Sequence, residues 1–300
     1  MKKLLITGAS GFLGWNIIQR TKSDWIIFGT FLTHPLDISD CNLIKIDLTN
    51  FHYLKQLFSQ IKPKAVIHTA AISDTNFCQK NRSVSYRINT EASINIAGLC
   101  SDFRIPCLFT SSDLVFDGLN PPYSEHDEPS PINIYGEQKA KAESGMRARY
   151  PETVISRMPL MFGDPGPVAE SFIQPFLKAI KSGIEVNLFV DEYRTPVSGK
   201  KAAEGIMIAL KKLPRVIHLG GIERISRYEF GNLLVKLFKI KNAKLNPLRQ
   251  KDLNMPAPRP PDVSLNSSKA MTLGFQPDTI KTELEYLQKD GGKNIMTCPD

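Results

Sequence analysis

The chain has 300 residues, of which 42% are apolar, enough for one large or two modest domains with a sizeable core. Its 38 basic and 30 acidic residues give a net charge of +8, and the lysines and arginines are scattered along the chain. This pattern favours a solvated basic surface over a nucleic-acid patch, and it suits a small anionic ligand.

The five cysteines are odd in number and lack CxxC spacing, so they support neither a disulfide framework nor a zinc site. We expect no metal and a reduced, cytoplasmic setting. The opening MKKLLITGASGFLG resembles a signal peptide, but Gly8, Gly11 and Gly14 interrupt its apolar run. We interpret it as a first strand, and no apolar stretch approaches the roughly 20 residues that cross a bilayer.

Short apolar runs rich in β-branched residues alternate with helical segments in the first half. We expect helices near 12–21, 50–61, 82–103 and 134–149, and strands at Lys3 to Thr7, Trp25 to Phe31, Leu43 to Ile46, Ala65 to His68, Cys107 to Thr110 and Thr153 to Arg157. Continuous apolar strands separated by helices predict a parallel sheet covered on both faces, a doubly wound α/β fold of the Rossmann type. Such sheets bind ligands beyond the carboxyl ends of their strands.

In the second half, predicted strands and helices alternate less regularly. We expect helices near 168–181, 199–211 and 226–239, strands near 184–190 and 215–219, and an ordered loop at the proline-rich 254–266. Residues 1–157 are therefore predicted to form the Rossmann domain, and residues 158–300 a smaller substrate-binding lobe. Elements near 196–220 are expected to return to the main sheet.

TGASGFLG follows the first strand and opens the first helix. Its glycines allow a tight turn and close approach of the backbone to a pyrophosphate, which the helix N-terminus then attracts. The spacing is GxxGxxG rather than GxGxxG, and the alternative is a glycine-rich turn without a ligand. The predicted dinucleotide-binding residues here are Gly8, Ser10, Gly11, Phe12, Leu13 and Gly14.

The end of the second strand, FGTFLTHP, indicates which dinucleotide binds. An acidic residue about 20 positions after the glycines normally binds the ribose 2′-hydroxyl of NAD, and none is present here. This absence favours NADP and leaves NAD open. Thr33 and His34 are the candidates beside a 2′-phosphate, and the alternative for His34 is an exposed loop histidine.

Two further segments lie at the carboxyl ends of predicted strands, on the same edge of the sheet. Asp47, with Leu48 after it, is placed to accept a hydrogen bond from the adenine amino group, or to cap the helix at 50–61. Thr69, Ala70 and Ala71 are small enough for a cofactor to lie flat against the backbone.

A candidate catalytic set comes last in this half. Ser111 and Ser112 end the fifth strand, and Tyr135 precedes Lys139 by one helical turn. Hydride addition to a carbonyl creates an alkoxide that needs a proton, which a tyrosine can donate. A nearby ammonium lowers the pKa of the phenol, and a serine hydroxyl polarises the carbonyl. The alternatives are a capping turn for the serines and a helix wall residue for Tyr135.

These motifs, with Asn89 in RINTEAS, SSDLVFDG and YGEQK, resemble the extended short-chain dehydrogenase/reductases. The stretches from Ser111 to Glu143 and RPPDVSLNSSKAMTLGF are most similar to dTDP-4-dehydrorhamnose reductases and their relatives, which include the regulatory β subunit of methionine adenosyltransferase. The resemblance implies that Ser112, Tyr135 and Lys139 are catalytic, that Tyr135 and Lys139 also contact the cofactor, and that Asp113 and Val115 adjoin the substrate.

One departure concerns the substrate. The rhamnose-forming reductases have a tryptophan after the strand that ends in arginine, whereas this chain has Met158, Leu160 and Met161. Arg194 in VDEYRTP is a candidate partner for a substrate phosphate or carboxylate, because a guanidinium suits such oxyanions. The alternative is a salt bridge with Asp191 or Glu192.

Three hypotheses follow from the motifs and the resemblance. The first is an NAD(P)H-dependent reductase of a keto group on a nucleotide-linked sugar. The second is an NAD-dependent epimerase or dehydratase, and the third is a non-catalytic NADP-binding regulatory subunit. All three imply a small-molecule ligand and no binding to nucleic acid or membrane. All three are compatible with a homodimer.

Overall fold

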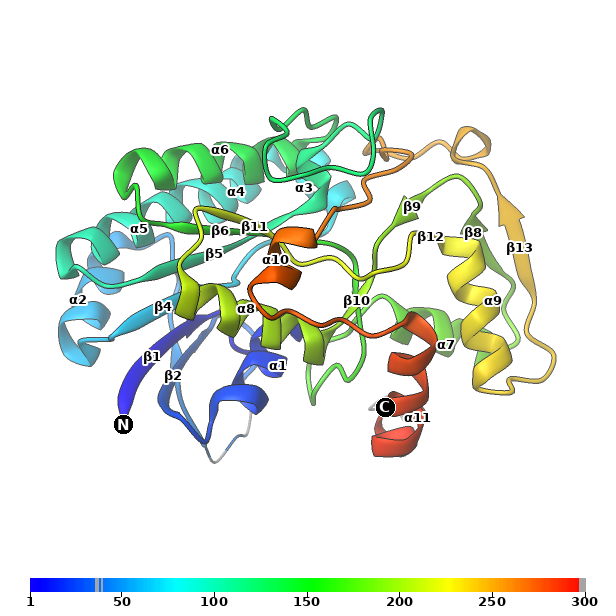
Figure 1. The fold of residues 1–300 in the computed structure, drawn as a ribbon, viewed down its shortest axis with the longest axis horizontal. Coiled ribbons are helices and arrows are strands. Elements are labelled where there is room, and N and C mark those ends of the chain that lie inside the picture. Colours follow the sequence, from blue (N-terminus) through cyan, green and yellow to red (C-terminus); the bar gives the residue numbers. More distant parts are fainter. Residues whose placement is uncertain (36–37, 39, 297–300) are drawn as a thin grey trace.

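The computed structural model describes residues 1–35, 38 and 40–296, and its centre is one parallel sheet (Figure 1). All six strand pairs of this sheet are parallel. In order across the sheet the strands are β11 (Val216–His218), β6 (Val154–Met158), β5 (Cys107–Ser112), β4 (Ala65–His68), β1 (Lys2–Thr7), β2 (Trp25–Phe31) and β3 (Cys41–Lys45).

Helices cover both faces of the sheet. One face packs on α1 (Phe12–Thr21) and α8 (Gly199–Lys212), and the other packs on α2 (Phe51–Ile61), α5 (Ala92–Phe103) and α6 (Ile134–Arg149). Each face has its own buried apolar cluster, so strands such as β4 are buried along their whole length. The predicted doubly wound α/β fold is confirmed.

Polar side chains mark where several helices begin. The side chains of Asn50, Asn133 and Ser198 accept hydrogen bonds from backbone N–H groups in the first turns of α2, α6 and α8. Ser226 and Glu229 form a reciprocal capping box at α9 (Arg227–Leu237). These caps fix the starting points of the helices that carry or support the site.

The predicted helix at 82–103 is divided into three parts. It consists of α4 (Arg82–Tyr86), a π-helical segment (Arg87–Glu91) and α5, and a short helix, α3 (Thr75–Lys80), precedes it. The π-helical turn brings Asn89 inward, where its side chain bonds both the N–H and the C=O of Ile72 and the side chain of Gln138. Asn89 therefore joins the loop after β4 to α6.

A smaller lobe lies beside the sheet, on the right of Figure 1. Its apolar cluster comes from α7 (Ile173–Lys181), β8 (Val186–Phe189), α9, β13 (Leu245–Leu248) and α11 (Ile280–Met296). Short pairs complete it: β9 (Tyr193–Arg194) with β12 (Ile225–Ser226), and β7 (Met161–Phe162) with β10 (Val197–Ser198). The helix α10 (Ser268–Thr272) packs near β11.

The second half departs from prediction at the start of α7. The helix expected from residue 168 begins at Ile173, because Ser171 and Gln174 instead form a side-chain-bonded turn. The helix α8 and strand β11 lie within residues 196–220, and β11 is an edge strand of the main sheet. A domain boundary after residue 157 stays a prediction.

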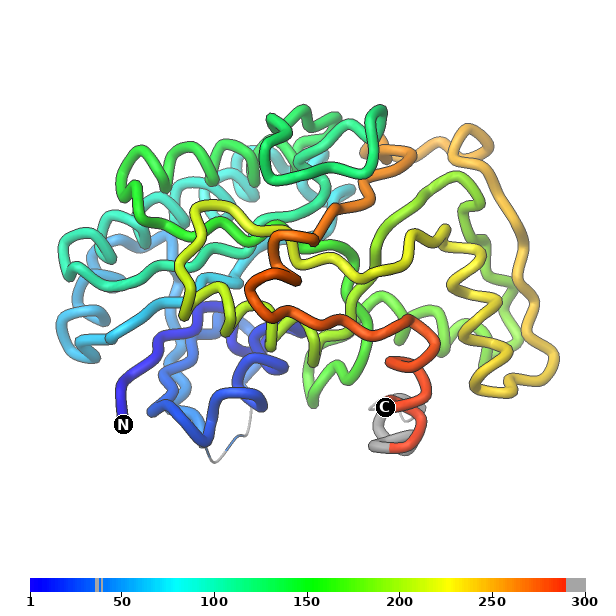
Figure 2. Tube along the Cα trace, viewed as in Figure 1, coloured from blue at the N-terminus to red at the C-terminus, as the bar shows by residue number. Residues whose placement is uncertain are grey.

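The proline-rich segment 254–266 crosses from the lobe to the first half as a loop, which Figure 2 shows in orange. The Pro258 carbonyl accepts a hydrogen bond from Asn133 at 3.2 Å, and the Ala257 N–H donates to Asn76 at 3.3 Å. Further along the segment, the Pro261 carbonyl accepts a hydrogen bond from the Tyr193 N–H of β9 at 2.8 Å. We call residues 254–262 the proline strap.

Among the described residues, no helix is both long and apolar enough to span a bilayer. The same residues contain no group of three or more His, Cys, Asp or Glu side chains that could hold a metal ion.

A buried ion pair joins α6 to β6. The Arg157 guanidinium contacts the Glu143 carboxylate through Nε at 3.1 Å and Nη2 at 2.9 Å, and both side chains are under 9% exposed. Arg157 also packs over the Phe116 ring. The pair holds the helix that carries Tyr135 and Lys139 against the sheet.

We expect Arg157→Met to reduce the free energy of unfolding by about 3–5 kcal/mol, because Glu143 is left buried without its partner. Urea denaturation measures this loss. Lys281→Met, which breaks the exposed Lys281–Glu285 contact at 3.8 Å, is the control and is expected to cost less than about 1 kcal/mol. Equal losses in the two variants would contradict the assigned role of Glu143 and Arg157.

Candidate active site

The glycine-rich turn connects β1 to α1 by a close backbone approach. Gly8 has φ +70°, and a Cβ there would lie 2.8 Å from the Ala70 backbone. A Cβ on Gly14 would overlap the Gly8 carbonyl oxygen. No side chain caps the first turn of α1, so its N–H groups face the sheet edge and can bind an anion.

A cavity of about 320 Å³ opens above this turn at the carboxyl ends of β1, β2, β3 and β4. It collects many of the residues that the sequence predicts to bind the dinucleotide. From that prediction its lining includes Gly8, Ser10, Gly11, Asp47, Leu48, Thr69, Ala70 and Ala71, together with Thr33. Phe12, Leu13 and Gly14 lie in the first turn of α1 beneath it. The uncapped helix and the side-chain-free approach at Gly8 fit a dinucleotide.

Asp47 lines this cavity but does not cap α2. Its carboxylate accepts hydrogen bonds from the Thr49 N–H at 2.9 Å and the Thr49 hydroxyl at 2.8 Å. Asn50 caps α2 instead, because it stands immediately before the helix and its side chain reaches the Tyr53 N–H. The capping alternative for Asp47 is therefore wrong, and its contact with adenine stays a prediction.

Thr33 and His34 lie beyond the end of β2. The Thr33 hydroxyl and the His34 Nδ1 are 2.8 Å apart, and both side chains are exposed. Only Thr33 lines the cavity, so the exposed-loop alternative describes His34 in this structure.

Ser112 ends β5 and begins a 3-10 turn at Asp113–Val115. Its Oγ accepts a hydrogen bond from the Leu114 N–H and donates one to the Asp113 carboxylate, each at 3.1 Å. Ser112 is thus both a capping residue and a candidate catalytic residue. The Ser111 hydroxyl is buried and has no hydrogen-bond partner.

Tyr135 and Lys139 project from one face of α6 into the buried region beside Ser112. Tyr135 is 7% exposed and Lys139 is 2% exposed. Burial raises the pKa of Tyr135, as does the Asp113 charge, while a hydrogen-bonding contact with Ser112 acts in the opposite direction. Ser112, Asp113 and Tyr135 therefore form one electrostatic group.

The Lys139 side chain is also buried, but it is a cation rather than a neutral phenol. Its Nζ donates a hydrogen bond to the Thr110 carbonyl at 2.6 Å and lies 4.1 Å from the centre of the Phe109 ring. Burial lowers the pKa of Lys139 to about 7, partly offset by Glu143. The expected lowering of the Tyr135 pKa by Lys139 is absent here, because desolvation and Asp113 dominate at the phenol.

The remaining predicted residues have different environments. Arg194 contacts Asp113 at 3.5 Å and Glu192 at 3.1 Å, so the salt-bridge alternative with Glu192 is present. Asp191 instead accepts a hydrogen bond from the Gln250 N–H. The Val115 side chain is fully buried in an apolar cluster with Phe116, so only its main chain is available near the site.

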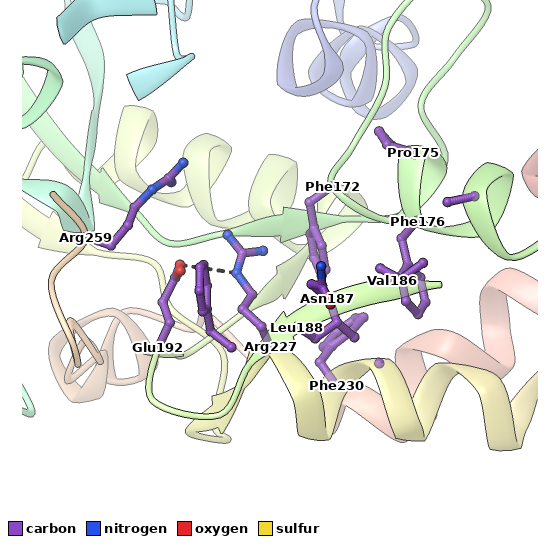
Figure 3. A pocket seen from close by; sticks show the side chains of 13 residues that line it. Phe172, Pro175, Phe176, Val186, Asn187, Leu188, Glu192, Arg227, Phe230 and Arg259 are labelled. Carbon is purple, nitrogen blue, oxygen red and sulfur yellow. Dashed lines mark hydrogen bonds and ion pairs between the residues drawn. The ribbon is translucent and has the colours of Figure 1, made fainter. Parts of the chain in front are cut away.

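The sequence reasoning missed a second cavity, of about 360 Å³, in the smaller lobe (Figure 3). Its walls are mainly apolar, and one end is charged. The lining includes Phe172, Phe176, Val186, Leu188 and Phe230, with Glu192, Arg227 and Arg259 at the charged end. Arg227 directly follows the Ser226 cap, and Arg259 lies in the proline strap, so neither stands in a recognisable motif.

The fold and this site together define the class of protein. A parallel doubly wound sheet, a glycine turn at its first helix and buried Ser112, Tyr135 and Lys139 side chains at the carboxyl edge are features of an extended short-chain dehydrogenase/reductase, a class of NAD(P)-dependent oxidoreductases. The family described as RmlD substrate binding domain matches residues 1–291, and the chain belongs to this family.

Known relatives have similar lengths. The chain is 28% identical to the probable low-salt glycan biosynthesis reductase Agl14 of Haloferax volcanii, over 94% of this chain and 96% of that protein. It is 26% identical to methionine adenosyltransferase 2 subunit beta of Xenopus laevis, over 91% of this chain and 83% of that protein.

Two solved structures illustrate the structural similarity. A hypothetical dTDP-4-dehydrorhamnose reductase from Sulfolobus tokodaii has 29% identity and a TM-score of 0.79, covering 90% of this chain and 94% of that chain. The dTDP-4-dehydrorhamnose reductase from Bacillus anthracis, solved with NADP, has a TM-score of 0.86 at 22% identity, covering 96% and 99%. The second comparison supports the fold alone.

We expect Gly14→Ala to weaken NADP binding at least about tenfold, because the added methyl group forces α1 away from the Gly8 carbonyl. Isothermal titration calorimetry measures the affinity. Gly145→Ala is the matched control, since its methyl group would meet only the flexible end of the Ile94 side chain. Unchanged affinity in Gly14→Ala would show that the turn does not form the cofactor cradle.

Lys139 gives a pH-dependent prediction. Folding lowers its pKa from 10.5 to about 7, so the unfolded chain binds more protons between these values and stability rises with pH there. Relative to Lys139→Met, the wild type should therefore gain free energy of unfolding from pH 7 to pH 9 and show no gain between pH 5 and 6.

Urea denaturation at each pH measures this difference, with the exposed Lys141→Met as control. A difference between wild type and Lys139→Met that stays constant across the range would contradict the lowered pKa.

Proposed function

We propose that the protein is an NADPH-dependent reductase of a keto group on a nucleotide-linked sugar. The observation that carries this proposal is the burial of Ser112 and Tyr135 together at the carboxyl edge of a sheet that also carries the glycine-turn cavity, in a chain whose smaller lobe has an aromatic, arginine-containing cavity. One cavity suits the cofactor and the other suits the nucleotide half of a substrate. The reacting carbonyl would lie between them.

The cofactor would be held by the glycine turn and the first turn of α1, with Asp47 near its adenine and Thr69, Ala70 and Ala71 along its length. No carboxylate follows β2 up to Pro35, which supports NADP over NAD because NAD normally uses an acidic residue there. The bound nicotinamide supplies the hydride. NAD remains the second cofactor that the site can accommodate.

Tyr135 would donate the proton that the developing alkoxide needs. A phenol with a raised pKa holds its proton at neutral pH, and proton donation then requires stabilisation of the phenolate. Lys139, one helical turn away, is the cation that can provide it once the phenolate forms. Ser112 would bind the substrate oxygen and orient it toward the Tyr135 hydroxyl.

The lobe cavity is suited to a nucleoside diphosphate. Phe172, Phe176 and Phe230 offer aromatic surface for a base, and Arg227 and Arg259 offer cations for the diphosphate. Arg194 contacts Asp113, which begins the turn that carries Val115, and the proximity of these three residues to the sugar is part of the proposal. A nucleotide-linked sugar agrees with the net charge of +8.

Two other functions use the same fold. A recycling epimerase or dehydratase would retain a tightly bound NAD and show no net cofactor oxidation. A regulatory subunit is favoured by the similarity to methionine adenosyltransferase 2 subunit beta, and it would form a stable complex with a synthetase without turnover. We also propose a cytoplasmic location and a homodimer, which fractionation and analytical ultracentrifugation test.

Tyr135→Phe is expected to reduce kcat by about 10²–10⁴-fold, because it removes the proton donor and leaves the ring in place. The assay follows NADPH oxidation with dTDP-4-dehydrorhamnose and other nucleotide-linked keto sugars. NADPH affinity and the melting temperature should match the wild type.

Tyr150→Phe is the control, since its hydroxyl contacts the exposed Glu152 at the far end of α6. Full activity in Tyr135→Phe would eliminate the mechanism. No turnover by the wild type, together with capture of a synthetase, would favour the regulatory function.

A further inference from the structure

A continuous line of charged side chains runs from the lobe cavity to Ser112. Arg227 at the cavity contacts the Glu192 carboxylate at 3.2 Å, and the same Oε1 atom receives Arg194 at 3.1 Å. Arg194 then contacts Asp113 at 3.5 Å, and Asp113 accepts the hydrogen bond of the Ser112 hydroxyl. Glu192, Arg194 and Asp113 are 2%, 3% and 3% exposed, so water screens these contacts weakly.

Arg194 is poorly placed to hold a substrate phosphate by itself. Two of its three nitrogens are already directed at Asp113 and Glu192. Its third nitrogen, Nη1, is buried and has no hydrogen-bond partner. Asp113 Oδ2 is likewise buried and makes no hydrogen bond. The cavity is lined by Arg227 and Arg259 rather than by Arg194. The contacts of Arg194 therefore point toward Asp113 rather than into the cavity.

The direction of the Ser112 hydroxyl follows from these contacts. A serine hydroxyl has one proton to donate, and here Asp113 receives it, so donation to a substrate carbonyl requires the hydroxyl to turn from Asp113 while its oxygen stays in place. The oxygen accepts a hydrogen bond from the Leu114 N–H, and the Ser112 side chain is also in hydrogen-bonding contact with Tyr135. The Asp113 carboxylate and the Leu114 N–H both hold the Ser112 oxygen in this position. Fixing the Asp113 carboxylate thus fixes the oxygen next to the phenol.

We propose that Arg194 is a positioning residue that acts through Asp113 to set the orientation of the Ser112 hydroxyl, and that it does not bind the substrate phosphate. This inference deepens the proposed function and rests on it for its kinetic test. Glu192 is shared by Arg194 and Arg227, and it holds Arg194 in place between the lobe cavity and Asp113. The line of charges therefore connects the nucleotide end of the site to its reacting end.

Removing Arg194 should lower kcat and leave binding intact. For Arg194→Met we expect kcat to fall at least about tenfold, with KM and the dissociation constant of dTDP within about threefold of wild type. Arg227→Met should show the reverse, a larger KM and weaker dTDP binding. Weaker dTDP binding with unchanged kcat in Arg194→Met would instead make Arg194 a phosphate ligand and overturn the inference.

A double-mutant cycle makes the test independent of folding losses. Asp113→Asn should lower kcat by a similar factor, and Arg194→Met added to it should lower kcat by no more than about twofold further. The double variant leaves no unpaired carboxylate at position 113, which protects it from unfolding. Independent, multiplicative effects of the two substitutions would contradict an action of Arg194 through Asp113.

The pH profile separates positioning from a merely structural role. The charged groups that face Asp113 are Arg194 from β9, Arg227 from α9 and Glu192 from the loop before β9, and Tyr135 faces it from α6. The two arginines lower the pKa of Asp113, so losing Arg194 raises it. The acid limb of kcat should therefore move to higher pH in Arg194→Met.

Arg224→Met is the matched control. Arg224 precedes β12, which pairs with the strand of Arg194, and it contacts Asp262 at 2.6 Å with no link to Ser112. Its kcat and pH profile should match the wild type. An unmoved acid limb in Arg194→Met, or an equal shift in Arg224→Met, would overturn the inference.

A carboxyl titration tests the inference even if the proposed function fails. If the wild type reduces no nucleotide-linked keto sugar, the function is wrong, and the Asp113 resonance can still be followed by carbon-13 NMR with labelled aspartate. Asp113→Asn assigns the resonance. A higher titration midpoint in Arg194→Met, absent in Arg224→Met, supports the coupling, and an unchanged midpoint overturns it.

Discussion

The close backbone approach among Gly8, Gly14 and Ala70 is the constraint on which the rest of the site depends. It brings the first turn of α1 against β1 and the end of β4 with no side chain between them. Any larger residue at Gly14 would displace the helix from the sheet edge. The same approach leaves a cavity above the turn, and α1 directs its uncapped N–H groups there. The same glycine turn therefore provides both the packing of α1 on the sheet and the surface proposed to bind the cofactor.

The parallel sheet then assembles the reacting groups around this cavity. Ser112 stands at the carboxyl end of β5, and α6 brings Tyr135 and Lys139 over the same edge. Asn89 and the Glu143–Arg157 pair hold α6 in position from its two sides. Most of these groups are buried, so solvent screens their charges only weakly. Small changes in their contacts therefore shift their pKa values strongly.

The sequence predicted the sheet, its helices and the candidate Ser, Tyr and Lys because these follow from local patterns. Apolar runs identify the strands of a parallel sheet, and a spacing of four places Tyr135 and Lys139 on one helical face. The lobe cavity could not be predicted, since Arg227 and Arg259 are brought together only by tertiary folding. The start of α7 was missed because Ser171 and its neighbours form a turn through side-chain bonds that periodicity does not report. The charges around Asp113 are likewise a property of the assembled lobe.

The proline strap restricts the motion of the smaller lobe relative to the sheet. It carries Pro256, Pro258, Pro260 and Pro261, each with a φ angle that is already restricted in the unfolded chain. Ordering the strap therefore costs less conformational entropy than ordering a flexible linker of the same length. A stiff tether bonded to both halves limits how far the lobe can move from the sheet.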